Sequence, residues 1–103
     1  MQKNEAQFER MAILSEELGE AVQIIGKIQR HGLDSEDPNG NPNRWLLEVE
    51  LGDILAAMCL LHYNGDINLD NIELATRQKM KKFKDGKAYL HHQKFGKDWP
   101  EIF

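Results

Sequence analysis

The chain has 103 residues and a formal net charge of −4 at pH 7. This length suits one domain with a modest hydrophobic core, for which association with other chains is a natural way to bury more apolar surface. The acidic balance argues against a nucleic-acid partner, and the longest apolar run, residues 54–61, is too short to cross a bilayer. With one cysteine, Cys59, and a polar N-terminus unlike a signal peptide, we expect a cytoplasmic protein without a membrane partner.

The first predicted element is a long helix from about Asn4 to about Arg30. It is followed by Gly32, which can end a helix by adopting a left-handed backbone conformation. Apolar residues recur along this helix at intervals of three and four, the spacing of one helix face. This main stripe consists of Met11, Leu14, Leu18, Val22 and Ile25.

A loop and a second helix come next. Residues 34–43, DSEDPNGNPN, are dense in turn-forming residues and have no hydrophobic face. The second helix is expected to begin near Pro42 or Asn43 and to end at about Tyr63. Between Trp45 and Leu61 it is apolar almost all round, so we expect it to be buried on most sides.

The third predicted helix follows a break at residues 64–66, with Asn68 as its N-cap, and extends from about Leu69 to about Tyr89. The C-terminal residues 91–103, HHQKFGKDWPEIF, are expected to pack as an arm. No segment alternates in the manner of a β-strand. The sequence therefore predicts a single all-α domain over residues 1–103, with three main helices and a C-terminal arm.

Acidic residues interrupt the apolar faces of the first two helices. At 100° per residue, Glu17 and Glu20 fall on a stripe that also contains Ile13 and Ile24, whereas Glu16 lies further round on a wetter side. On the second helix, two acids share one face with four apolar residues. This face consists of Leu46, Glu50, Asp53, Ala57, Leu60 and Leu61.

Carboxylates in an apolar setting are costly unless they are paired or bind a metal, and basic partners are scarce on these two faces. The simplest resolution is a divalent cation, and an all-oxygen site favours Mg²⁺, Mn²⁺ or Ca²⁺ over zinc or copper. The alternative is an ordinary solvated face, which is the usual meaning of an isolated acidic stretch such as SEELGE. The second acidic pair, on a helix that is otherwise almost wholly apolar, favours the inward arrangement.

Two lysines of the third helix are candidates for binding an anionic group. Lys79 lies at the edge of the apolar face beside Phe83, and Lys82 flanks it. Lys79 can bind a phosphate as a point charge, or it can pack its stem on the apolar face and keep its amine in water. The sequence has no Glu-x-x-His pair of the kind that di-iron bundles use, and no phosphate-binding GxxxxGK[ST] loop.

The motifs EELGE (16–20) and ELGD (50–53), followed by a helix that bears Lys79, resemble the MazG-like all-α nucleoside triphosphate pyrophosphohydrolases. The hallmark of that family is EExxE followed by ExxD on two antiparallel helices. The resemblance implies four-helix bundles completed by oligomerisation, as a homodimer or a homotetramer. The 29 residues between Glu20 and Glu50 lie at the long end of the family's spacing, and Phe83 stands where another cation is expected.

The resemblance also implies roles for individual residues. Mg²⁺, or Mn²⁺ in its place, would be held by the four inward acids, Glu17, Glu20, Glu50 and Asp53. Glu16 would be a further ligand or would orient the attacking water, and Glu16 or Glu17 would take the proton from that water. Lys79, with Lys82 beside it, would contact phosphate. The implied reaction converts a (d)NTP to the (d)NMP and pyrophosphate, possibly in nucleotide pool sanitation. Two alternatives stay open: a non-catalytic helical oligomer that binds nucleotide or protein, and a dUTPase-like diphosphohydrolase.

Overall fold

The computed structural model describes residues 4–85, which form three α-helices. Helix α1 spans Glu5–His31, α2 spans Asn43–Tyr63 and α3 spans Leu69–Lys84, and no named strand occurs within this range. The all-α prediction is therefore confirmed for the described residues. The chain divides into two compact units, one up to Ile67 and one from Asn68, and each is described by itself.

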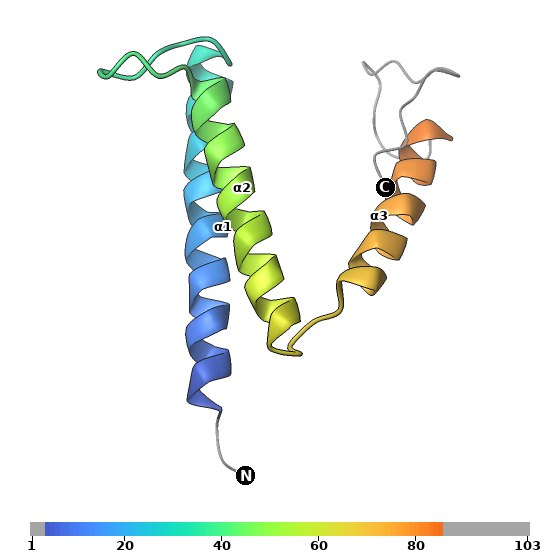
Figure 1. The fold of residues 1–103 in the computed structure, drawn as a ribbon. Coiled ribbons are helices and arrows are strands. Elements are labelled where there is room, and N and C mark those ends of the chain that lie inside the picture. Colours follow the sequence, from blue (N-terminus) through green and yellow to red (C-terminus); the bar gives the residue numbers. More distant parts are fainter. Residues whose placement is uncertain (1–3, 86–103) are drawn as a thin grey trace. The chain divides into compact units, whose positions relative to one another are not determined.

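In the first unit, α1 and α2 pack side by side as an antiparallel hairpin (Figure 1). The least exposed side chains of each helix recur at intervals of three and four, which is the spacing that keeps one stripe against a neighbouring helix. We call these two stripes the seam. The seam consists of Leu14, Glu17, Ala21, Ile24 and Ile28 on α1, and of Asn43, Leu47, Glu50, Ile54, Ala57 and Leu61 on α2.

The seam differs from the apolar stripe that stands out in the sequence of α1. The seam is centred on Ala21, while Leu18 and Val22 lie to one side of it, and Val22 is 67% exposed. The expectation that α2 is buried on most sides is wrong for this hairpin, because Leu51 and Leu55 are also exposed. Two helices cover only one stripe of each other, so most of the apolar surface of α2 has no partner within the hairpin.

The connection between α1 and α2 is held by polar contacts rather than by a hydrophobic face. Gly32 ends α1 with a φ of 92°, in the region that favours glycine. The Asp37 carboxylate accepts hydrogen bonds from the backbone N–H groups of Asn39 and Asn41, at 2.9 and 2.8 Å. Buried Asn43 donates through its side-chain amide to the Gly32 carbonyl oxygen at 3.1 Å. This last contact joins the end of α1 to the start of α2.

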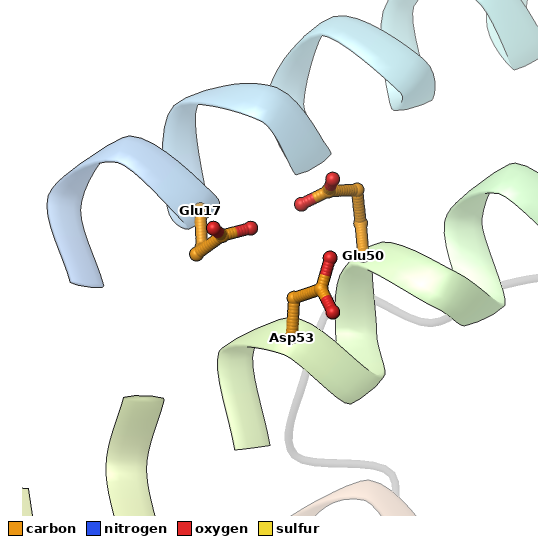
Figure 2. A group of neighbouring side chains, drawn as sticks. All are labelled: Glu17, Glu50 and Asp53. Carbon is orange, nitrogen blue, oxygen red and sulfur yellow. The ribbon is translucent and has the colours of Figure 1, made fainter. Parts of the chain in front are cut away.

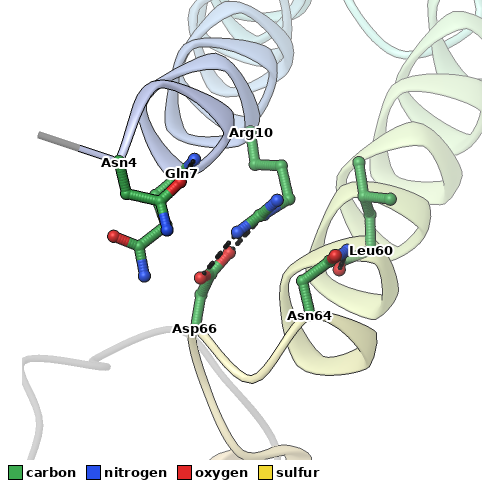
Figure 3. Close-up of polar contacts among 6 residues, drawn as sticks. All are labelled: Asn4, Gln7, Arg10, Leu60, Asn64 and Asp66. Carbon is green, nitrogen blue, oxygen red and sulfur yellow. Dashed lines mark hydrogen bonds and ion pairs between the residues drawn. The ribbon is translucent and has the colours of Figure 1, made fainter.

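At the other end of the hairpin, an ion pair ties α1 to the turn that follows α2 (Figure 3). The Arg10 guanidinium donates two hydrogen bonds to the two carboxylate oxygens of Asp66. The Asp66 side chain is 2% exposed and that of Arg10 is 14% exposed. Asn4 caps the first turn of α1 by accepting a hydrogen bond from the Gln7 N–H at 3.0 Å.

In the second unit, the Asn68 side chain accepts a hydrogen bond from the Asp70 N–H, so the predicted N-cap of α3 is confirmed. The described part of this helix ends at Lys84. Its predicted end near Tyr89, and the predicted C-terminal arm, lie outside the described residues. No helix within residues 4–85 combines the length and the apolar character needed to cross a membrane.

Candidate metal centre

Three carboxylates from two helices converge at the middle of the hairpin (Figure 2). Glu17 comes from the seam of α1 and Glu50 from the seam of α2, while Asp53 lies one turn further along α2. One oxygen of each carboxylate lies within 4.8 Å of the others. The structure thus places three of the four predicted metal ligands together, because the two motifs face each other across the antiparallel hairpin.

Glu50 is the most deeply placed of these acids, with 8% of its surface exposed. Hydrogen bonding with Glu20, burial, and hydrogen bonding with Glu17 together raise the pKa of Glu50 to about 7. Each of these contacts favours the protonated form of a carboxyl group. Glu20, the fourth predicted ligand, is itself exposed but lies close enough to interact with Glu50.

The structure supplies little positive charge to offset these acids. Arg10 lies on the same side of α1 as Glu17, two turns earlier, but its guanidinium is bound to Asp66. Within residues 4–85, no lysine or arginine forms an ion pair with Glu17, Glu50 or Asp53. The expectation that basic partners are scarce at this site therefore holds for the described residues.

Two buried oxygens at the site, Oε2 of Glu17 and Oε2 of Glu50, have no hydrogen-bond partner within residues 4–85. A buried carboxylate oxygen without a partner is costly, and such groups in native structures commonly mark a bound ion or water. A divalent cation would satisfy both oxygens and offset the repulsion among the carboxylates. The donor set, which consists only of carboxylate oxygens, fits Mg²⁺ or Mn²⁺.

Next to the acids, the hairpin has an open hollow of about 470 Å³. Glu17 and Asp53 form its polar wall, and four apolar side chains form the rest. The apolar lining consists of Ile13, Ala56, Ala57 and Leu60. Of these, Ala56 was missed by the sequence analysis, although it lies three residues after Asp53 and so belongs to the same side of α2.

The remaining predicted site residues are Glu16 on α1 and two lysines on α3, and each helix is described by itself. Glu16 is exposed, in agreement with its predicted place on the wetter side of α1. Lys79 and Lys82 are exposed on α3, in the second unit. The Lys79 amine lies over the ring of Phe83, 5.4 Å from its centroid, so its stem follows the apolar face of α3. Phosphate binding by these lysines stays a prediction.

The raised pKa of Glu50 predicts a specific dependence of stability on pH in metal-free protein. The folded state keeps the proton up to about pH 7, whereas the unfolded chain releases it near 4.5. The contribution of protonated Glu50 to the free energy of unfolding is therefore fully present below pH 4.5 and is lost as the pH rises through 7. We expect the melting temperature in EDTA to fall between pH 5 and pH 8.

The control for this pH dependence is Glu50→Gln, which removes the titrating group but leaves the histidines that titrate in the same range. Its melting temperature should fall less steeply than that of the wild type. Excess Mg²⁺ should reverse the wild-type trend, because metal binding requires the deprotonated carboxylate. If the melting temperatures of the two proteins fell equally steeply with pH in EDTA, the assignment of the raised pKa to Glu50 would be wrong.

No protein-family model, curated protein or solved structure matches this chain.

Proposed function

We propose that this protein is a Mg²⁺-dependent nucleotide pyrophosphohydrolase, which converts a (d)NTP to the (d)NMP and pyrophosphate. The observation that carries the proposal is the convergence of Glu17, Glu50 and Asp53, since Glu17 and Glu50 each have a buried oxygen without a hydrogen-bond partner among the described residues. These acids belong to the paired motifs EELGE and ELGD, so the residues that resemble the pyrophosphohydrolases are also the residues that form the site.

In this proposal, Glu17, Glu50 and Asp53 hold the cation, and Glu20 is positioned by its contact with Glu50. When bound, Mg²⁺ neutralises phosphate charge and lowers the pKa of a coordinated water. Glu16, which is exposed and precedes Glu17 in the sequence, is the proposed acceptor of the proton from the attacking water. The proposed role of Lys79 and Lys82 is to contact the triphosphate as point charges.

The hollow beside the acids supports a substrate with one charged end and one apolar end. Its acidic wall would face the metal-bound phosphates, while Ala56 and Leu60 offer an apolar surface to the base and sugar. A nucleoside triphosphate has both parts. The proposal also includes a homodimer or homotetramer, since the hairpin alone leaves large apolar side chains such as Val22 and Leu55 exposed.

The direct test is to incubate the purified full chain with each common (d)NTP in Mg²⁺ or Mn²⁺ and to separate the products by anion-exchange chromatography. We expect nucleoside monophosphate and pyrophosphate in equal amounts, and no turnover in EDTA. Turnover confined to dUTP would favour the dUTPase-like diphosphohydrolase. Measurable nucleotide binding without any hydrolysis would favour the non-catalytic oligomer and contradict the proposed activity.

A further inference from the structure

We propose that the ion pair between Arg10 and Asp66 holds one wall of the hollow in place and so sets the affinity of the site for its substrate. These two residues, with the Gln7 side chain that also bonds to Asp66, are called the clamp. They are positioning residues, which act on the substrate through the hollow and do not touch it. The inference rests on the proposed function for the identity of the substrate, but the attachment of α1 that it describes does not depend on hydrolysis.

The clamp lies at the end of the hairpin where no loop joins the two helices. At the opposite end, the helices are joined by their connecting loop and by the hydrogen bond from Asn43 to the Gly32 carbonyl oxygen. Among residues 4–13, Arg10 is the only residue that is not exposed, and the seam begins only at Leu14. The first turns of α1 are therefore held to the rest of the hairpin mainly through Arg10.

The other half of the clamp is fixed to the end of α2 through its own backbone. After α2 ends at Tyr63, the chain turns back at Gly65, which has a φ of 79°. The Asp66 N–H then donates a hydrogen bond to the carbonyl oxygen of Leu61 at 2.9 Å, and Leu61 is fully buried in the seam. Arg10 thus attaches α1 to a turn that is itself bonded to the last turn of α2.

The geometry and charge of the clamp suit a fixed attachment. The guanidinium donates to both carboxylate oxygens of Asp66, and such a two-bonded pair fixes orientation as well as separation (Figure 3). Hydrogen bonds from Arg10 and Gln7 lower the pKa of Asp66, so its carboxylate is ionised at neutral pH. Since Asp66 already occupies the Arg10 guanidinium, we assign Arg10 a positioning role and not a contact with phosphate.

The clamp is next to the hollow along both helices. On α1, Ile13 lines the hollow and follows Arg10 by about 4.5 Å along the helix axis. On α2, Leu60 lines the hollow and directly precedes Leu61, whose carbonyl oxygen binds the Asp66 backbone. The clamp therefore joins the two stretches of helix that carry Ile13 and Leu60, and the width of the hollow between these side chains depends on it.

The acids lie further from the clamp and have support of their own. Glu17 follows Arg10 by about 10.5 Å along the axis of α1. Two seam residues hold this part of the helix against α2, namely Leu14 one turn before Glu17 and Ala21 one turn after it. Loss of the clamp should therefore displace Ile13 more than the carboxylates, and it should weaken substrate binding more than metal binding.

The kinetic test uses Arg10→Met, assayed in Mg²⁺ with the (d)NTP that the wild type hydrolyses fastest and at a temperature where circular dichroism shows the variant to be folded. We expect KM to rise at least about 10-fold, since a small displacement far from the chemistry can cost up to about 100-fold. The value of kcat should stay within about threefold, because the acids keep their arrangement. Arg44→Met is the matched control, since it breaks the exposed pair with Asp34 and should leave both constants unchanged.

A second variant distinguishes positioning from direct contact with the substrate. Arg10→Met combined with Asp66→Leu replaces the ion pair by two apolar side chains of similar size, and buried ion pairs are often replaced in this way without loss of stability. We expect the double variant to return KM to within about threefold of the wild type. A KM that stays high in this folded variant would show that the charge of Arg10 itself is needed, and would overturn the positioning role.

Hydrogen exchange without any ligand reads the attachment of α1 separately from hydrolysis. In Arg10→Met, the backbone amides of residues 9–14 should exchange at least about 10-fold faster, those of residues 18–28 should keep their rates, and the double variant should restore protection. Unchanged exchange at residues 9–14, or a wild-type KM in Arg10→Met, would overturn the proposal. If the wild type hydrolysed no nucleotide while exchange changed as expected, the proposed function would fail and the attachment of α1 by the clamp would stand.

Discussion

Replacing Glu50 with glutamine is expected to lower the turnover of nucleoside triphosphate by at least about 100-fold, since loss of even an outer partner of a metal ligand typically costs 10- to 100-fold. Glu50 is the most buried acid of the cluster, and one of its oxygens has no partner within the described structure. Glutamine has nearly the same shape but cannot supply a carboxylate to a cation. The measurement is the initial rate of pyrophosphate release at saturating Mg²⁺.

The same substitution should affect stability in the opposite direction. At pH 8 in EDTA, wild-type Glu50 is mostly ionised among Glu17, Glu20 and Asp53, and glutamine removes that repulsion. We therefore expect Glu50→Gln to melt at a higher temperature than the wild type without metal, and to gain less from added Mg²⁺. A residue that serves only the fold would not combine a loss of activity with a gain in stability.

Glu48 provides a matched control two residues away on the same helix. It is exposed and lies outside the acid cluster, so Glu48→Gln removes one carboxylate from α2 without touching the site. Its turnover and its response to Mg²⁺ should stay close to those of the wild type. If Glu50→Gln and Glu48→Gln had the same rates, the assignment of the metal centre would be wrong.

The largest effect on stability is expected from Asp66→Asn. This change removes the carboxylate that holds the Arg10 guanidinium, and it leaves a cation with little access to water. Breaking such a pair on one side is strongly destabilising, because the remaining charge keeps its desolvation cost without compensation. We expect the melting temperature to fall by several degrees, with the N-terminal turns of α1 losing protection against hydrogen exchange first.

The second Arg–Asp pair in the hairpin is the control for Asp66→Asn. Arg44 and Asp34 form an ion pair at 3.2 Å, but their side chains are 53% and 82% exposed. Exposed ion pairs contribute little to stability, so Asp34→Asn should leave the melting temperature nearly unchanged. Equal effects of the two substitutions would show that burial of the Arg10–Asp66 pair has no energetic consequence.

Local signals in the sequence predicted the helices well. Turn-forming residues and caps placed the ends of α1 and α2 close to where the structure has them, and Asn68 marked the start of α3. Helical periodicity put Glu17, Glu50 and Asp53 on apolar stripes, and the structure brings these three acids together, although Asp53 is exposed. The same periodicity put Glu20 on the inner stripe of α1, whereas the structure leaves Glu20 exposed.

Contacts that depend on pairing between helices were not predictable in the same way. Helical periodicity identifies the apolar stripes of α1, but it does not show which of two adjacent stripes packs against α2. In the structure, the stripe with Ala21 packs against α2, and the stripe with Val22 is exposed. The Arg10–Asp66 ion pair joins residues that are 56 positions apart, so no local sequence pattern predicts it. The position of Lys79 relative to the acids is likewise a question of how separate elements assemble.

The two alanines of the seam have a consequence for the proposed binding of a cation. Ala21 lies one turn after Glu17, Ala57 lies one turn after Asp53, and both are buried. Small side chains at a contact between helices allow the two backbones to approach closely, and each of these alanines lies one turn from an acid of the cluster. We therefore expect the distance between the carboxylates of α1 and those of α2 to depend on the small size of Ala21 and Ala57, which are not among the proposed ligands. If the proposed site binds a cation, a bulkier residue at either alanine is expected to push the two helices apart and so to weaken that binding.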